Sequence, residues 1–137
     1  MSSPSIVPVV CALIERGGLM LMAQRPPHKH LGLKWEFPGG KIESGESAEN
    51  ALHRELREEL GCTVEILHAL PRTTHAYENI TIEMIPFVAR LAPDSTEPHP
   101  HEHVALRWVD PLALASLDLP AADGPIIAAY LALRSRS

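Results

Sequence analysis

The apolar residues of this 137-residue chain fall into short strand-like runs that are interrupted by one clear helical pattern. Runs rich in β-branched and aliphatic residues are typical of strands, whereas an apolar stripe recurring every three or four residues is typical of an amphipathic helix. The runs that we interpret as strands cover residues 6–15, 19–24, 35–38, 63–76, 79–91 and 104–109. The helical pattern covers residues 48–60. We also predict a short helix over residues 112–116, capped by Asp110, and a terminal helix over residues 126–134.

Turn residues and prolines mark the connections between these elements. Arg16-Gly17-Gly18 predicts a hairpin between the first two strands. Residues 26–34 and 92–100 carry Pro, Gly and polar residues, so we expect loops there. Pro71 and Pro86 interrupt apolar runs, and they indicate sheet edges or bulges because proline cannot donate a ladder hydrogen bond.

The predicted helix over residues 48–60 carries acidic residues where packing would favour aliphatic ones. Ser47 is a favourable N-cap and Gly61 a favourable C-terminal stop. At about 100° per residue, one stripe is formed by the apolar residues Ala48, Ala51, Leu52, Leu56 and Leu60. Glu55 and Glu59 fall inside this stripe, and Glu58 borders it. Burying a lone carboxylate costs on the order of several kcal/mol unless it is paired or coordinated.

Two interpretations of these acids remain open from the residues alone. They could form a solvated charged face with Arg54 and Arg57 as partners, or they could hold a divalent cation. Clustered carboxylate oxygens are hard ligands suited to Mg²⁺, with Mn²⁺ as a substitute. We favour the metal site, because the glutamates share the apolar face of the helix and the two arginines do not.

Composition and charge narrow the class of protein. The net charge of −5 argues against a duplex-binding protein, which would show a basic face. No apolar run has the length of a membrane span, and residues 1–5 lack the basic region of a signal peptide. Cys11 and Cys62 lie in apolar, strand-like surroundings, which indicates a reducing compartment. We therefore expect a cytoplasmic protein of one domain, monomeric or homodimeric, that binds neither duplex nucleic acid nor membranes.

A cluster of histidines at residues 99–103 resembles a metal site only superficially. Neutral imidazoles bind Zn²⁺, but no cysteine or further histidine follows with matching spacing. Adjacent positions of an extended chain also point to opposite sides. We therefore do not assign a zinc site to this segment.

The chain resembles the Nudix family around the helix. The family's box is Gly-x5-Glu-x7-Arg-Glu-U-x-Glu-Glu-x-Gly-U, where U is a bulky aliphatic residue. Gly40, Glu46 and residues 54–61 match every fixed position of this box, and only Cys62 departs, at its last aliphatic position. Residues 35–43, Trp-Glu-Phe-Pro-Gly-Gly-Lys-Ile-Glu, resemble the MutT-like branch in particular.

This resemblance implies a fold, a reaction and a set of ligands. The expected fold is an α/β/α sandwich with a mixed sheet, formed by residues 1–137 as a single domain. The expected reaction is Mg²⁺-dependent hydrolysis of a nucleoside triphosphate to the monophosphate and pyrophosphate. The expected metal ligands are the Gly39 carbonyl, Glu55, Glu58, Glu59 and Glu102. Glu102 precedes Trp108 by six residues, as does the loop glutamate of MutT-like enzymes. Whether Glu55 or Glu102 is the general base stays open.

Three residues of the box are expected to support the site rather than to react. Gly40 lets the backbone approach a ligand closely because it has no Cβ atom. Glu46 and Arg54 are eight residues apart, so they are not neighbours on one helix. The resemblance implies that Glu46 folds back from the loop onto Arg54 and fixes the loop.

Five further residues are candidates for substrate binding, and they are Arg25, His30, Phe37, Lys41 and Asp123. Arg25, Phe37 and Asp123 match positions that contact or approach the nucleotide in MutT-like enzymes. His30 could help to hold phosphate or base, and Lys41 could balance phosphate charge. The alternatives are a solvated Arg25 and His30, a core role for Phe37, and a helix-capping role for Asp123.

The position of Asp123 leaves the base open. The type enzyme of the branch has Asn there, whereas an ionised Asp only accepts hydrogen bonds. It would suit the N1–H and N2–H of guanine or the amino group of cytosine. Our first expectation is an enzyme that removes 8-oxo-dGTP, and the first alternative is a CTP or 5-methyl-dCTP pyrophosphohydrolase. An ADP-ribose or dinucleoside polyphosphate hydrolase, and a nucleotide-sensing module without catalysis, are further alternatives.

Overall fold

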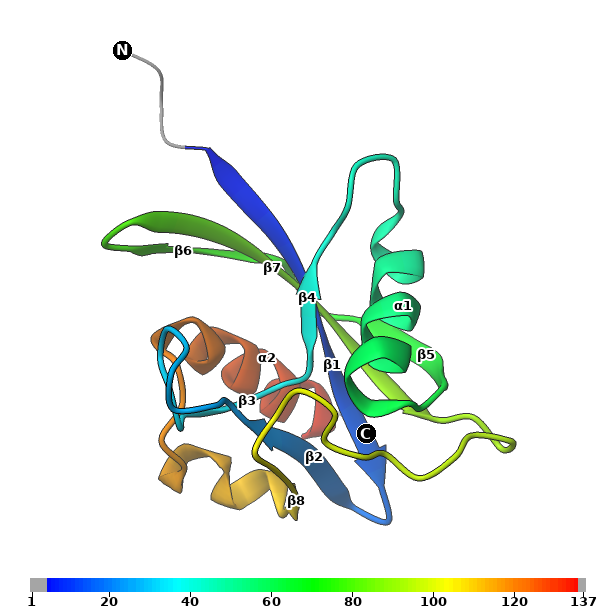
Figure 1. Cartoon of the computed structure of the whole chain (residues 1–137). Helices are drawn as coiled ribbons and strands as arrows, with labels where there is room; N and C mark the ends of the chain where they lie inside the picture. Colours follow the sequence, from blue (N-terminus) through cyan, green and yellow to red (C-terminus); the bar gives the residue numbers. More distant parts are fainter. Residues whose placement is uncertain (1–4, 136–137) are drawn as a thin grey trace.

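The structure, a computed structural model, describes residues 5–135 and consists of one mixed sheet with helices on both faces (Figure 1). The strands are β1 (Ile6–Arg16), β2 (Leu19–Gln24), β3 (Trp35–Glu36), β4 (Gly39–Lys41), β5 (Val64–Ala69), β6 (Thr73–Tyr77), β7 (Ile80–Leu91) and β8 (Ala105–Val109). The helices are α1 (Ala48–Leu60) and α2 (Gly124–Arg134), with the short 3₁₀ helices η1 (Pro111–Ser116) and η2 (Ala121–Asp123).

The two long strands, β1 and β7, form the centre of the sheet. They run parallel, from the pair Ile6–Thr81 to the pair Glu15–Arg90. All other pairs are antiparallel, so the expected mixed sheet is confirmed. The other edge of β1 is shared between β4 near its start and β2 near its end. The other edge of β7 is shared between β6 and β5 in the same way.

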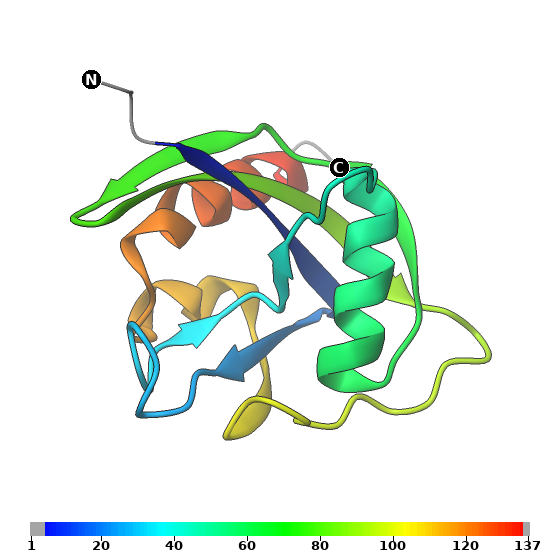
Figure 2. The same cartoon turned by 45° about the horizontal axis from the view of Figure 1, so that its top comes forward.

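Alternating side chains of β1 supply the two cores of the sandwich. Val10, Ala12 and Ile14 belong to the core under α1, whereas Cys11 and Leu13 belong to the core under α2 and η1. Figure 2 shows α1 and α2 on opposite sides of this strand. Because both faces of β1 are covered, its sequence is almost continuously apolar. The expected α/β/α sandwich is confirmed.

The predicted strand over residues 63–76 is wrong in one respect, because it is two strands. β5 and β6 are separated at residues 70–72, around Pro71. On β7, Pro86 occupies the position at which the partner changes from β6 to β5, and its carbonyl accepts a hydrogen bond from Leu70 N at 3.0 Å. The absent N–H of Pro86 therefore falls where the ladder is already interrupted.

Two other elements differ from the sequence-based expectation. Gly39–Lys41, expected as a loop, forms strand β4 and pairs with β1 in the register Val9–Lys41 to Cys11–Gly39. The short helix after Asp110 is a 3₁₀ helix that begins at Pro111. Within residues 5–135, none of the helices is both long and apolar enough to cross a membrane.

Helix α1 begins and ends where its caps predict. Ser47 Oγ accepts a hydrogen bond from Asn50 N at 3.1 Å, which satisfies one of the free donors of the first turn. Gly61 adopts a left-handed conformation, with φ of 65°, and its N–H donates to Arg57 O at 3.0 Å. These caps fix the phase of the helix and hence the direction of its acidic side chains.

Candidate active site

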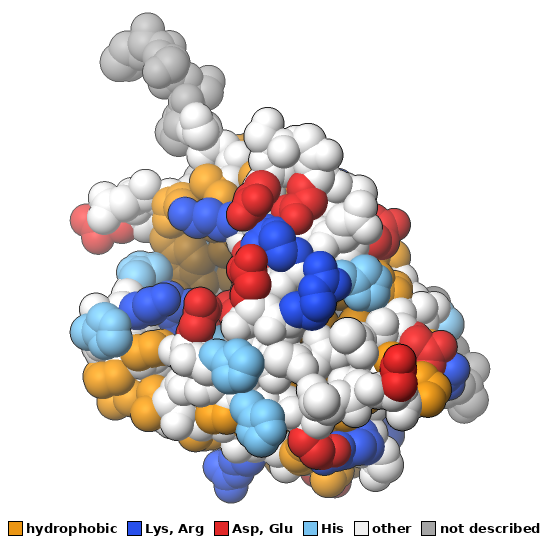
Figure 3. Space-filling model, turned by 45° about the vertical axis from the view of Figure 1, so that its right-hand side comes forward, with side chains coloured by type: hydrophobic (Ala, Val, Ile, Leu, Met, Phe, Trp, Pro, Cys, Tyr) orange, Lys and Arg blue, Asp and Glu red, His pale blue; other side chains and the backbone are white. Residues whose placement is uncertain are grey.

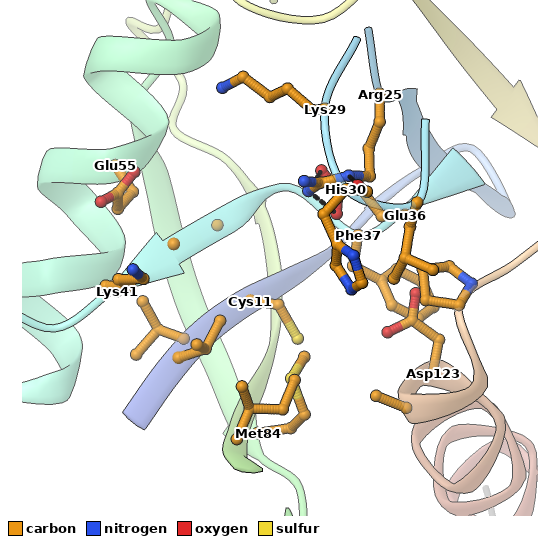
Figure 4. A pocket seen from close by; sticks show the side chains of 18 of the residues that line it. Cys11, Arg25, Lys29, His30, Glu36, Phe37, Lys41, Glu55, Met84 and Asp123 are labelled. Atoms are coloured by element: carbon orange, nitrogen blue, oxygen red, sulfur yellow. Dashed lines mark hydrogen bonds and ion pairs between the residues drawn. The ribbon is translucent and has the colours of Figure 1, made fainter. Parts of the chain in front are cut away.

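A pocket of about 450 Å³ opens between α1, strand β4 and the segment that leads into α2. Figure 3 shows a hollow with apolar walls and with acidic and basic side chains on its rim. In the close-up of Figure 4, Glu55 and Lys41 lie at one end of the pocket, and Glu36 and Asp123 lie at the other. The apolar residue Met84 lies between these two ends.

Glu59 is the most buried acid of the first end, which we call the acidic end and which comprises Glu55, Glu59 and strand β4. Its side chain points inward from α1, and the residue is 8% exposed. Oε2 of Glu59 accepts a hydrogen bond from Gly39 N at 3.2 Å. Burial, together with the negative charges of Glu55, Glu36 and Glu102, raises the pKa of Glu59 to about 9. A positive charge at this end would relieve both effects.

Glu55 lies against the backbone of Gly40. A Cβ atom on Gly40 would lie 2.5 Å from Oε2 of Glu55 and 2.7 Å from Oε1. Partial burial is the main reason why the pKa of Glu55 is raised above its usual value. Only glycine leaves room for this carboxylate, which explains the residue type at position 40.

Arg54 gathers the acids around the loop before α1. Its Nε and Nη2 bond to the two oxygens of Glu46 at 2.6 and 2.9 Å, and Nη2 also bonds to Lys41 O at 3.1 Å. The hydrogen bond from Arg54 lowers the pKa of Glu46 to about 2. Nη1 donates to Glu55 at 3.0 Å and to Glu58 at 3.2 Å. The structure thus brings Glu46 onto Arg54, as the sequence suggested.

The acidic end suits a hard divalent cation by the chemistry of its donors. Its carboxylates lie on one face of α1, where Glu59 is buried and Glu55 is half-buried, and carboxylate oxygens are hard ligands. Within residues 5–135, no three His, Cys, Asp or Glu side chains form a ready-made metal-binding group. Arg54 engages Glu55 and Glu58 in this arrangement. A cation would therefore take these carboxylates over from the guanidinium group.

The acids predicted as ligands differ in their surroundings. Glu55 and Glu59 line the pocket, whereas Glu58 does not, and its side chain is 56% exposed. Glu102 is exposed on the loop between β7 and β8 and does not line the pocket. Its negative charge nevertheless acts on both Glu55 and Glu59, so it lies on their side of the molecule.

The opposite end of the pocket comprises Glu36, Phe37, Tyr77, Ala122 and Asp123, and we call it the apolar end after its aromatic wall. Asp123 is its most buried acid. It is 4% exposed, and its Oδ2 has no hydrogen-bond partner among the residues that the structure describes. Burial, together with the negative charge of Glu36, raises the pKa of Asp123 to about 8. Its side chain makes no capping hydrogen bond to α2, so the capping interpretation is wrong. Asp123 is therefore neutral near pH 7 and able to donate as well as accept.

Aromatic rings form part of the wall beside Asp123. Phe37 lines the pocket and also belongs to the core under α2, so its core role is observed and its contact with a base stays a prediction. Tyr77 of β6, which the sequence pattern did not single out, lines the pocket and contacts the ring of His30 edge-on, with 5.6 Å between ring centroids. The Tyr77 hydroxyl accepts a hydrogen bond from Ala122 N at 3.2 Å. It thereby fixes the segment that carries Asp123.

Arg25 does not extend into solvent but is bound within the pocket wall. Its Nη1 donates to both oxygens of Glu36, at 3.0 and 3.3 Å, and its Nε donates to His30 O at 2.8 Å. Glu36 also lies 3.0 Å from Nε2 of His103. Sequence reasoning missed Glu36 and His103, because no local spacing signals a contact between residues 67 positions apart.

The pocket collects most of the residues that the sequence singled out. Those that line it are Arg25, His30, Phe37, Gly39, Gly40, Lys41, Glu55, Glu59 and Asp123. Those that do not are Glu46, Arg54, Glu58 and Glu102. Cys11 also lines the pocket, and burial raises its pKa well above the usual value.

Known proteins resemble the chain over this whole region. A family model described as the NUDIX domain matches residues 9–129, which include every pocket-lining residue named above. The CTP pyrophosphohydrolase of Escherichia coli is 40% identical over 131 residues, 95% of each chain. A putative 8-oxo-dGTP diphosphatase 2 of Mycobacterium tuberculosis is 38% identical over 116 residues, 84% of this chain and 81% of its own. The solution structure of the E. coli ORF135 protein matches with a TM-score of 0.84 at 36% identity, over 97% of this chain and 94% of that one.

Proposed function

The chain belongs to the Nudix hydrolase family, and we propose that it hydrolyses a cytosine nucleoside triphosphate such as CTP to the monophosphate and pyrophosphate. One observation carries this proposal: a single pocket joins an end lined by Glu55 and Glu59 to an apolar end that contains the buried Asp123, whose Oδ2 has no hydrogen-bond partner within residues 5–135. The first end suits a triphosphate with its cations, and the second suits a base.

The acidic end would supply the chemistry of phosphate hydrolysis. The residues that would hold Mg²⁺ there are the Gly39 carbonyl, Glu55, Glu58, Glu59 and Glu102. When bound, Mg²⁺ neutralises phosphate oxygens and lowers the pKa of a coordinated water. Lys41 lines this end of the pocket and would balance phosphate charge. Arg54 would keep the loop before α1 in place through Glu46.

A carboxylate is needed to take the proton of the attacking water. Glu55 and Glu102 are the candidates for this general base. Glu55 lines the pocket, and its raised pKa brings it nearer to the range that suits proton transfer. Glu102 reaches the same acids only through its charge. Glu55 is therefore the candidate that the geometry favours.

The neutral Asp123 supports cytosine as the base. The Watson–Crick edge of cytosine presents the N4 amino donor beside the N3 acceptor. A protonated carboxyl group matches this edge, because its carbonyl oxygen accepts from N4 and its hydroxyl donates to N3. Burial favours this protonated form of Asp123. The CTP pyrophosphohydrolase that is 40% identical to the chain gives this proposal independent support.

The same carboxyl group favours 8-oxo-dGTP as a second candidate substrate. The N7–H and O6 atoms of 8-oxoguanine also place a donor beside an acceptor, and a neutral Asp123 complements that edge equally well. The relative from Mycobacterium tuberculosis is named as a putative 8-oxo-dGTP diphosphatase. Cytosine is preferred here because the similarity to the CTP enzyme covers more of the chain.

A panel of nucleotides tests the proposed function. The wild-type protein is incubated with Mg²⁺ and CTP, 5-methyl-dCTP, UTP, 8-oxo-dGTP, ADP-ribose or a dinucleoside polyphosphate, and products are separated by anion-exchange chromatography. We expect CMP and pyrophosphate from CTP, with a higher kcat/KM than for UTP. Preferred turnover of 8-oxo-dGTP would establish the second candidate. Cleavage of ADP-ribose or dinucleoside polyphosphates alone would contradict both, and no turnover at all would indicate a binding module.

A further inference from the structure

His103 is buried although it belongs to an exposed loop. Its neighbours His99 and His101 are exposed, whereas the His103 side chain is 4% exposed. Nε2 of His103 lies 3.0 Å from Oε2 of Glu36. An ionised carboxylate only accepts hydrogen bonds, so Nε2 is the donor of this bond. Within residues 5–135 the other ring nitrogen, Nδ1, has no hydrogen-bond partner, so the polar role of the ring rests on Nε2.

Glu36, the hydrogen-bond partner of His103, is part of the pocket wall. Glu36 lines the apolar end, where its charge acts on Asp123. Arg25 holds the Glu36 carboxylate from a second direction through Nη1. Without the bond from His103, the Glu36 carboxylate would be held by Arg25 alone. The orientation of Glu36 therefore depends on both partners.

His103 also fixes the place of the acid that precedes it. Glu102 is exposed, and its charge reaches Glu55 and Glu59. The loop is attached at either side of this pair, by His101 N to Glu59 O at 3.0 Å and by Val104 N to Gln24 O at 2.9 Å. The buried imidazole lies between these two attachments, so it sets how the backbone presents Glu102.

We propose that His103 is a positioning residue that connects the two ends of the pocket, orienting Glu36 beside the base and Glu102 beside the metal-binding acids. The choice of CTP as the test substrate rests on the proposed function, whereas the measurement of metal affinity does not. The consequence of this arrangement is that base selectivity and metal affinity share one side chain that contacts neither the nucleotide nor the metal ion.

A matched pair of substitutions tests the reach of the ring. In His103→Gln the side-chain amide nitrogen reaches about as far as Nε2, whereas in His103→Asn it is one bond too short. His99→Leu is the control on the same loop. Two quantities are measured: the ratio of kcat/KM for CTP over UTP, and the Kd of Mn²⁺ for the nucleotide-free protein by electron paramagnetic resonance. Cooperative thermal melting establishes that each variant is folded.

The two variants distinguish the length of the side chain from the volume that it fills. His103→Asn should lower the selectivity ratio and weaken Mn²⁺ binding, each by about tenfold, the lower end of the effect of removing an outer-shell partner. His103→Gln should restore both to within about threefold of wild type, and His99→Leu should change neither. In a Glu36→Ala background, His103→Asn should cause no further loss of selectivity.

Two results would overturn the inference. One is a His103→Asn variant with wild-type selectivity and wild-type Mn²⁺ affinity. The other is a His103→Gln variant as impaired as His103→Asn, which would mean that the ring only fills space. A wild-type protein that does not hydrolyse CTP contradicts the proposed function instead, and the Mn²⁺ measurement then still decides on His103.

Discussion

The Glu55 carboxylate lies so close to Gly40 that a Cβ atom on that glycine would be 2.5 Å from Oε2. The contact joins strand β4 to helix α1 at the acidic end of the pocket. The obstructing atoms belong to the flexible end of a side chain, so the fold can accommodate a methyl group by moving Glu55. At Gly39 a Cβ atom would instead overlap the backbone of Val10 and lie 2.7 Å from the Cα atom of Cys11.

Gly40→Ala should therefore impair catalysis more than stability. We expect the melting temperature to stay within a few °C of wild type, and kcat for CTP to fall by at least about tenfold, because Glu55, the acid that we propose as a metal ligand, is displaced. Gly124→Ala is the matched control, because a Cβ atom there meets nothing within 4 Å. A Gly40→Ala enzyme with wild-type kcat would show that the position of Glu55 is not critical.

Arg54→Lys should loosen the loop before α1. The arginine fork contacts Glu46 with two nitrogens and also reaches Lys41 O and Glu55, and an ammonium group cannot reproduce this geometry. We expect a fall in kcat/KM of about tenfold or more, measured at saturating Mg²⁺. Arg57→Lys, on an exposed position of the same helix, should have no effect. Equal activity of the two variants would show that the guanidinium group of Arg54 is not needed to hold the loop before α1.

Substrate binding should depend on the protonation of Asp123. Its pKa of about 8 means that the free enzyme loses the hydroxyl donor as the pH rises through 8. The kcat/KM for CTP should fall over this range. Asp123→Asn keeps one donor and one acceptor without titrating, so the ratio of variant to wild-type kcat/KM should rise with pH. A ratio that is constant between pH 6.5 and 9.5 would contradict a role for protonated Asp123.

The same residue should make folding depend on pH. Its folded-state pKa of about 8 lies above its ordinary value of 3.8, so the native state binds a proton that the unfolded chain has lost. The stabilising effect of this proton is complete below about pH 4 and is lost as the pH rises to 8. Denaturation by urea should thus show that Asp123→Asn becomes more stable relative to wild type from pH 5 to pH 8. The opposite trend would mean that Asp123 is ionised in the native state.

Glu59→Gln should stabilise the metal-free protein. The pKa of Glu59 rises from 4.5 to about 9 in the folded protein, so near pH 7 the wild type must take up a proton when it folds. Gln keeps the shape of the side chain and avoids this cost. In EDTA we expect the melting temperature to rise by about 3 °C or more, the shift that corresponds to 1 kcal/mol in a protein of this size. Addition of Mg²⁺ should raise the melting temperature of the wild type but barely that of the variant. A variant that is less stable in EDTA would mean that the charge of Glu59 is already compensated.

Local signals in the sequence predicted both ends of α1 correctly, and they predicted which of its faces is acidic. Ser47 and Gly61 are caps whose chemistry acts within one turn, and the phase of the helix then places Glu59 inside. The break in the strand over residues 63–76 was not predicted, because it depends on the ladder that Pro86 interrupts on a different strand.

The apolar end of the pocket shows more clearly what the sequence alone could not predict. The sequence indicated Asp123 as a base contact, but it suggested an ionised group, since nothing nearby in the chain predicts burial. Tyr77 and Glu36 enter the wall from different strands, and His103 bonds to Glu36 from a loop. Such contacts arise only when distant segments pack, and a single sequence carries no periodicity that reports them.

The central claim is that a buried acid on α1 serves a divalent cation in nucleotide hydrolysis. The most direct test is the kcat of Glu59→Gln for CTP in saturating Mg²⁺, relative to wild type and to Glu65→Gln as the control on an exposed strand position. We expect kcat to fall by at least about 100-fold in Glu59→Gln and to stay unchanged in Glu65→Gln. Turnover near the wild-type value by Glu59→Gln would contradict the central claim.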